Sequence, residues 1–171
     1  MQDSQSYAEG DNSYDSQYNV KIVEFPMTRV AVLEHRGDPD RIEDSISKFI
    51  NWRKQNHLPP NTSATFNILY NNPAETAPED YRFDLCAATD EPITENDYGV
   101  VAKTIPAGRC AVLRHVGDDG TLNKSMAYLV GQWLPMSGEV PRAFPLFLQR
   151  VLFAPAVPVQ EAIVDIFLPL Q

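Results

Sequence analysis

The sequence has little of what marks a disulfide-bonded, phosphate-binding or membrane-spanning protein. It holds two cysteines and eight glycines in 171 residues. Two cysteines make no disulfide framework and fit a reducing compartment, and the thinly spread glycines form no phosphate-cradling loop. No apolar run reaches the roughly 18–20 residues that span a bilayer, and the N-terminus lacks a basic, apolar signal peptide. These absences predict a cytoplasmic chain without a membrane segment.

Basic residues are scarce as well. Lysine and arginine number 14 against 23 aspartates and glutamates, which gives a net charge of −9. A negative field repels phosphate backbones, so we expect no direct nucleic-acid binding by this chain. An acidic surface also keeps a protein soluble, and the apolar fraction of 43% is enough for the core of one ordinary domain.

An internal repeat is the most informative feature that is present. Residues 25–38 (FPMTRVAVLEHRGD) return 80 positions later as residues 105–118 (IPAGRCAVLRHVGD). Proline, arginine, alanine, valine, leucine, histidine, glycine and aspartate are identical in register. One such unit is too small to bury its own apolar face, so the repeat predicts a pseudo-two-fold pair with a ligand cleft between the repeats.

Each unit is expected to run strand, strand, helix, strand, strand, and its first strand is either separate or an extension of the second. Asp38 and Pro39 suit the start of the first helix, and Leu134-Pro135 predicts the end of the second. Apolar stripes at helical spacing mark the two helices at Ile42, Ile46, Phe49 and Ile50, and at Leu122, Met126, Leu129 and Val130. Strands are expected at 20–25, 29–35, 65–70 and 81–88, and at 109–115, 146–153 and 162–168. The predicted fold class is α+β, an antiparallel sheet with two helices on one face and the other face concave between the repeats.

The same reading predicts one domain preceded by a polar segment. Residues 1–19 have almost no aliphatic side chains and are expected to be a disordered tail or linker. The domain then covers 20–171, with repeat one at 20–89, an acidic connector at 90–97 and repeat two at 98–171.

Candidate catalytic and metal-binding residues are few. His35 and His115 are repeat equivalents, and neither has a cysteine or carboxylate at ligand spacing. Cys86 and Cys110 lie in expected strands without a recognisable base, as small buried hydrophobes do. We therefore expect no catalytic residue, no metal and no cofactor.

Two strands carry the candidate ligand-binding residues. Phe66, Ile68 and Tyr70 alternate along one strand and so share a face. Leu146, Leu148 and Arg150 alternate along the equivalent strand. If they also point into the cleft between the repeats, the two sets form an apolar, aromatic-walled pocket with Arg150 at its edge. Trp133 could then close this pocket. Plain core packing explains each of these side chains equally well. The predicted site is Phe66, Ile68, Tyr70, Trp133, Leu146, Leu148 and Arg150.

Two further strings resemble a known family. Residues 70–84 (YNNPAETAPEDYRFD) are similar to the "Tyr-Asp-Asp/Asn-Pro … Thr-Pro … Arg-Tyr-Asp" stretch of GyrI-like domains, and Tyr128 to Pro135 resembles their "Tyr … Trp-Leu-Pro" helix end. The resemblance covers about residues 20–170. It implies two strand-helix-strand-strand repeats that bind lipophilic, often cationic, small molecules between them. Such domains serve as effector-binding parts of AraC-type and MerR-type regulators, while some members inhibit gyrase and others hydrolyse cyclopropane-bearing alkylating agents.

The sequence departs from the family at one position. Many members carry a buried glutamate in a "Pro-x-aromatic-Glu-x-Tyr" strand, whereas residues 145–150 (PLFLQR) place Leu148 at the glutamate and Arg150 at the tyrosine. The resemblance then implies no hydrolysis and weaker cation selection, with binding of hydrophobic or aromatic molecules retained.

We therefore predict a non-catalytic small-molecule-binding module, monomeric or weakly dimeric, that stands alone or derives from an AraC-type regulator. Two alternatives stay open. One is a hydrolase that uses another acid, such as Asp84 or Glu34. The other is a gyrase-inhibitor-like protein-interaction module.

Overall fold

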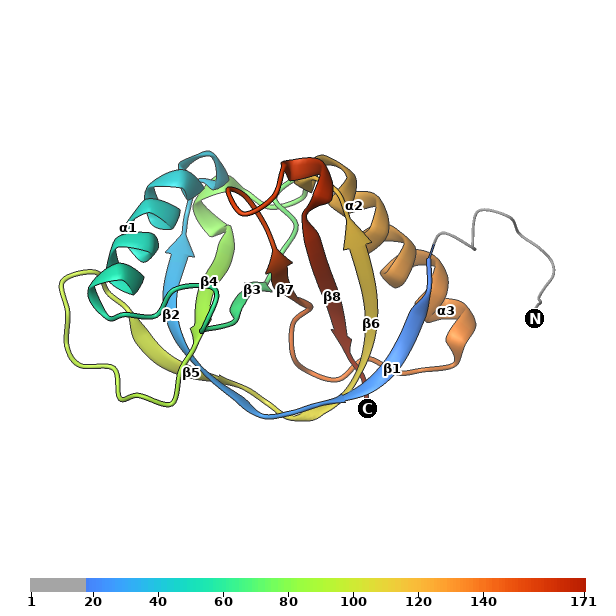
Figure 1. The fold of residues 1–171 in the computed structure, drawn as a ribbon. Coiled ribbons are helices and arrows are strands. Elements are labelled where there is room, and N and C mark those ends of the chain that lie inside the picture. The colour runs from blue at the N-terminus through green and yellow to red at the C-terminus, as the bar shows by residue number, and fades with distance from the viewer. Residues whose placement is uncertain (1–17) are drawn as a thin grey trace.

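The computed structural model describes residues 18–171, so the expected tail lies almost wholly outside the described residues. The fold is α+β, as predicted. Eight antiparallel strands form one sheet in the order β1-β6-β8-β7-β3-β4-β2-β5, which curls into a half-barrel (Figure 1). The strands are β1 (Val20–Phe25), β2 (Thr28–Arg36), β3 (Thr65–Leu69), β4 (Arg82–Ala88), β5 (Val101–Ile105), β6 (Gly108–Val116), β7 (Phe147–Leu152) and β8 (Ile163–Pro169).

The first strand of each repeat is separate and crosses to the other repeat. β1 pairs with β6 of the second repeat, while β5 pairs with β2 of the first. Only Pro26 and Met27 link β1 to β2, and only residues 106 and 107 link β5 to β6, so the β1–β2 ribbon passes the β5–β6 ribbon where these two links lie (Figure 1). Each repeat thus supplies an edge strand to its partner.

Both helices lie on the outer side of the curl, one beside each half of the sheet (Figure 1). The helix α1 (Ile42–Gln55) follows a 3₁₀ turn in which the Asp38 carboxylate accepts a hydrogen bond from the Asp40 amide. The helix α2 (Asp119–Tyr128) begins similarly, with Asp118 accepting from the Thr121 amide. None of the helices among the described residues is long and apolar enough to cross a membrane.

The second helical segment ends two residues after Pro135, close to the predicted end, but it is not one regular helix. After α2 the chain makes a π-helical turn (Leu129–Trp133) and continues as α3 (Leu134–Ser137) to Gly138 in the left-handed conformation. Pro135 is tolerated because it lies in the first turn of α3. A π turn accommodates one extra residue, and here the repeat offset grows from 80 to 81. Trp52 and Trp133 match at the larger offset.

The sheet has two differently packed faces. On the outer face, Phe49 and Trp52 of α1 pack on Leu33 and Leu85, while α2 packs over a second cluster that includes Leu148. The inner face carries a third cluster that is rich in phenylalanine: Phe25, Phe66, Phe147 and Phe167. The Phe147 and Phe167 rings stack with centroids 4.9 Å apart. Burial of each such ring contributes about 1.5–3 kcal/mol, so this cluster joins the two repeats.

A histidine–serine pair ties each helix to its strand. His35 Nδ1 lies 2.7 Å from the Ser45 hydroxyl and its Nε2 lies 2.9 Å from the Asp38 carbonyl oxygen. A carbonyl only accepts, so Nε2 carries a hydrogen, and in the neutral imidazole Nδ1 then accepts from the serine. His115 and Ser125 repeat the arrangement at 2.9 Å. The duplicated histidines therefore fasten strand ends to helices.

Candidate functional site

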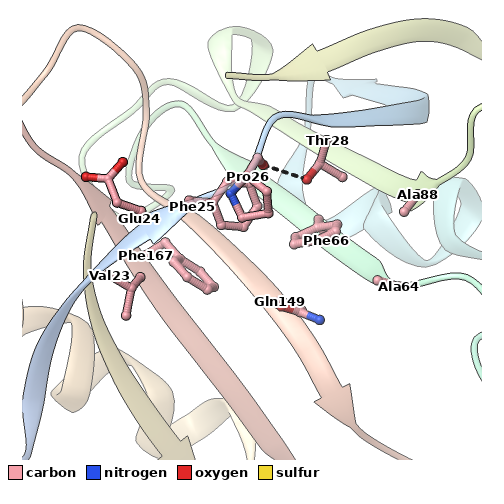
Figure 2. Close-up of a pocket in the computed structure, with 10 residues that line it drawn as sticks. All are labelled: Val23, Glu24, Phe25, Pro26, Thr28, Ala64, Phe66, Ala88, Gln149 and Phe167. Carbon is pink, nitrogen blue, oxygen red and sulfur yellow. Dashed lines mark hydrogen bonds between the residues drawn. The ribbon is translucent and has the colours of Figure 1, made fainter. Parts of the chain in front are cut away.

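The inner face opens into a cavity of about 410 Å³ beside the junction of β1 and β2 (Figure 2). The Phe25, Phe66 and Phe167 rings form its walls, and the Ala64 and Ala88 methyl groups leave the space in front of them open. The complete lining is Val23, Glu24, Phe25, Pro26, Thr28, Ala64, Phe66, Ala88, Gln149 and Phe167.

Polar groups contribute little to this cavity. The Thr28 hydroxyl is occupied, because it donates to the Pro26 carbonyl at 2.9 Å. The Glu24 carboxylate points away from the rings, whereas the Gln149 side chain lies at the edge of the cavity (Figure 2). The cavity therefore suits an apolar or aromatic group better than a fully charged one.

A buried cation fixes the loop that forms one wall. Arg53 at the end of α1 donates to the Leu58 and Ser63 carbonyl oxygens and to the Thr65 hydroxyl, each at 2.8 Å. Burial lowers the pKa of Arg53 to about 10, so the guanidinium stays charged at neutral pH. These bonds hold the loop that precedes β3 and hence the position of Ala64.

A charged cluster lies farther along the inner face of the first repeat. The Asp84 carboxylate is fully buried and receives hydrogen bonds from Arg36 at 3.0 Å, Lys103 at 3.0 Å and the Tyr70 hydroxyl at 2.7 Å. Glu34 also pairs with Arg36 and Lys103. Both carboxylates are thus engaged by cations of the chain itself.

The pKa shifts in this cluster follow from burial and from these contacts. Burial raises the pKa of Tyr70, and its hydrogen bond to Asp84 adds to the shift. Burial alone would lower the pKa of Lys103, but hydrogen bonds to Glu34 and Asp84 outweigh it and raise that pKa. The phenol therefore stays neutral and the ammonium stays charged at neutral pH.

The two cysteines are buried on the inner face. Burial raises the pKa of the Cys86 thiol well above its ordinary value, and it also raises that of Cys110. A protonated, buried thiol is a poor nucleophile. Neither cysteine therefore has the setting of a catalytic residue.

The structure divides the predicted site residues between the two faces. Phe66 lines the cavity, Ile68 lies beside it in the inner cluster, and Tyr70 packs at the edge of that cluster. Trp133, Leu146 and Leu148 instead belong to the cluster beneath α2. Arg150 donates to Asn67 at 2.9 Å and to Asp119 of α2 at 2.7 Å.

The expectation that both strands turn these side chains into one seam was therefore wrong. In the β3–β7 register Ile68 faces Phe147, so Leu148 is opposite Asn67 and both point to the other face. The inner-face residues of β7 are Phe147 and Gln149, and neither is among the predicted ligand-binding residues. Phe147 and Gln149 alternate along the strand just as Leu146, Leu148 and Arg150 do. The local sequence therefore does not show which of the two sets points to the inner face. The ligand contacts of all seven residues stay predictions.

Comparison with known proteins identifies the fold and a family. The family model described as GyrI-like small molecule binding domain matches residues 18–171. A relative in Escherichia coli K12, "Probable transcriptional regulator YgiV", is 40% identical over 153 residues, which cover 89% of this chain and 96% of the relative.

Solved structures share the fold at low identity. The EcmrR–DNA complex matches with a TM-score of 0.75 at 15% identity, covering 93% of this chain, which spans 59% of the EcmrR chain. SAV2435 bound to tetraphenylphosphonium matches with a TM-score of 0.53 at 9% identity, covering 90% of this chain and 98% of that one. A structure named as a hydrolase from Listeria innocua matches with a TM-score of 0.61 at 10% identity, covering 89% of this chain and 91% of that one.

Proposed function

We propose that this chain, which belongs to the GyrI-like small-molecule-binding domains, binds a lipophilic aromatic compound and catalyses no reaction on it. The observation that carries the proposal is the open apolar cavity walled by Phe25, Phe66 and Phe167. Apolar surface buried there contributes about 25 cal/mol per Å² before the costs of association. A pocket with three ring walls is a ready site for a flat apolar ligand.

The biological role that we propose is sensing of a small molecule in transcriptional regulation inside the cell. The relative named as a probable transcriptional regulator is matched over 96% of its length. The net charge of −9 disfavours contact with DNA, so we expect a partner to supply DNA binding.

Positive charge on the ligand is, in this proposal, tolerated and not required. Support for tolerance comes from the acidic chain and the ring walls, since cation–π contacts contribute about 0.5–2 kcal/mol. Support for the absence of a requirement comes from Leu148, which replaces the family glutamate and lies 1% exposed beneath α2.

The absence of catalysis is proposed from the state of the acidic residues. Asp84 is bonded to Arg36, Lys103 and Tyr70, and Glu34 is paired with the same two cations. A general acid or base must reach the substrate with a free oxygen. Asp84 does not meet that condition, because Arg36 occupies its Oδ1 and Lys103 and Tyr70 occupy its Oδ2. Glu34 binds both cations through Oε2, and these ion pairs hold its carboxylate in the charged cluster and not at the cavity.

The test is a calorimetric titration with a matched pair of compounds, methyltriphenylphosphonium and the neutral triphenylphosphine oxide. We expect saturable binding of both, with affinities within about 30-fold, which corresponds to the upper end of a cation–π contact, about 2 kcal/mol. Saturable binding of neither would overturn the binding proposal. Chromatography after incubation with a cyclopropane-bearing alkylating agent should show it unchanged beyond the protein-free rate, and turnover would favour the hydrolase instead.

A further inference from the structure

The two repeats differ at the position of the cavity. At the repeat offset of 80 before the π turn and 81 after it, the second-repeat residues that match Thr28, Ser63, Ala64 and Phe66 are Gly108, Phe144, Pro145 and Phe147. We call the place formed by these four residues the counterpart position. It lies where the pseudo-two-fold symmetry would put a second cavity.

The counterpart position is filled by side chains of the loop before β7. Phe144 stands edge-to-face on Phe147, with ring centroids 6.1 Å apart and planes at 78°. Arg142 donates to the Leu170 carbonyl at 3.0 Å and to the Arg109 carbonyl at 3.1 Å. Its guanidinium lies against the backbone of Gly108, where an added Cβ would come within 2.7 Å of it. A ring and a cation of the chain itself therefore occupy this place.

In the first repeat the equivalent ring is missing. Ser63 replaces Phe144, and its hydroxyl donates to the Ala88 carbonyl at 2.8 Å. The small Ala64 side chain lines the opening in front of Phe66. Because Arg53 holds the Ser63 carbonyl at 2.8 Å, the loop is fastened beside the cavity and does not easily close it.

We infer that the cavity takes one planar aromatic ring of a small molecule, placed edge-to-face on Phe66 as Phe144 is placed on Phe147. This inference rests on the proposed function and names the part of the ligand and the place that it occupies. Edge-to-face ring pairs are favourable beyond their buried area. Since Phe144 already fills the counterpart position, one such ring binds per chain.

The chemistry of the ring follows from what borders the cavity. Thr28 stands where the counterpart has Gly108, so its side chain takes the space that the Arg142 guanidinium uses there. A cationic head against the β2 backbone is thereby disfavoured. Gln149 lines the cavity, and its amide has no hydrogen-bond partner among residues 18–171. A neutral ring with one weakly polar substituent matches this setting, because an amide both donates and accepts.

The affinity test uses N-phenyl-1-naphthylamine, a neutral aromatic compound that fluoresces in apolar surroundings. The parent chain should bind one molecule saturably. Ala64→Phe places a ring in the cavity and should weaken binding at least tenfold, with circular dichroism confirming that the variant is folded. The matched control is Phe144→Ala at the counterpart position, which should leave the affinity of the first-repeat site within twofold. Equal affinity of Ala64→Phe and the parent would overturn the inference.

The location test uses alanine methyl groups labelled with carbon-13. On titration with the same compound, the NMR signals of Ala64 and Ala88 should shift, while that of Ala111, buried beneath α2, should stay in place. Saturable binding that moves Ala111 and leaves Ala64 unmoved would overturn the inference and leave the proposed function standing. The absence of saturable binding by any compound tried would overturn both.

Discussion

Replacing Asp84 by asparagine should cost far more stability than the same change at its repeat equivalent, Asp165. The Asp84 side chain is fully buried between Arg36 and Lys103, with the Tyr70 hydroxyl as a third donor. Asparagine keeps the shape but removes the charge, and its amide nitrogen meets the same donors.

The magnitude follows from burial. Removing one partner of a buried ion pair costs about 3–5 kcal/mol. The Arg36 and Lys103 side chains are 33% and 29% exposed, so water can solvate them again, and we expect a cost at or just below the lower end of that range, about 2–3 kcal/mol. The Asp165 side chain is 15% exposed and, within residues 18–171, bonds only Arg114, which is 57% exposed. An ion pair with so exposed a partner contributes about 0–1 kcal/mol.

Urea unfolding followed by circular dichroism measures the difference between Asp84→Asn and Asp165→Asn. Equal slopes with denaturant would show that the variants unfold as the parent does. The Asp84 change should also lower the melting temperature by roughly 4–12 °C, at about 2–4 °C per kcal/mol for a chain of this size. If the two variants agreed within about 0.5 kcal/mol, the reasoning from burial would be refuted.

Three further outcomes are expected. Tyr70→Phe should lower the free energy of unfolding by about 1 kcal/mol at neutral pH. Because the pKa of the phenol is raised in the folded state, this difference should be full below about pH 10 and shrink above it. A pH-independent difference in urea unfolding would contradict this. Arg53→Ala should destabilise by about 2–4 kcal/mol, since it leaves the Leu58 and Ser63 carbonyl oxygens without their donor, and it should weaken binding of N-phenyl-1-naphthylamine; unchanged affinity would show that the loop does not shape the cavity. Leu148→Glu should lower the free energy of unfolding by about 2–4 kcal/mol, because it buries a carboxyl group beneath α2. Calorimetry should show methyltriphenylphosphonium gaining affinity over triphenylphosphine oxide only if ligands bind on that face of the sheet.

The duplication and its elements could be predicted from the sequence because their signals are local. The matching stretches, the apolar stripes and the capping residues Asp38 and Asp118 each depend on neighbours a few positions away. The π turn also leaves a local trace, because the repeat offset changes from 80 along the helix stripes to 81 at Trp52 and Trp133.

The faces of the strands could not be predicted in the same way. Which alternating set of β7 points inward depends on its pairing with β3, and a shift of one residue exchanges Phe147 for Leu148. The cavity depends further on Ser63 and Ala64 being small where the other repeat has Phe144 and Pro145. The offset of 81 pairs these residues in the sequence, but only the structure shows that Ala64 lines a cavity beside Phe66.

The exchange of β1 and β5 gives the molecule the architecture of a homodimer joined into one chain. A single repeat would leave β2 or β6 without its outer neighbour, and a second copy would supply that strand. In a dimer the subunit concentration decides how often the two copies meet. The connector at 90–97 replaces that dependence, because it holds the two repeats together at a high effective concentration. Two peptides divided within this connector should therefore reassemble into the intact half-barrel when mixed.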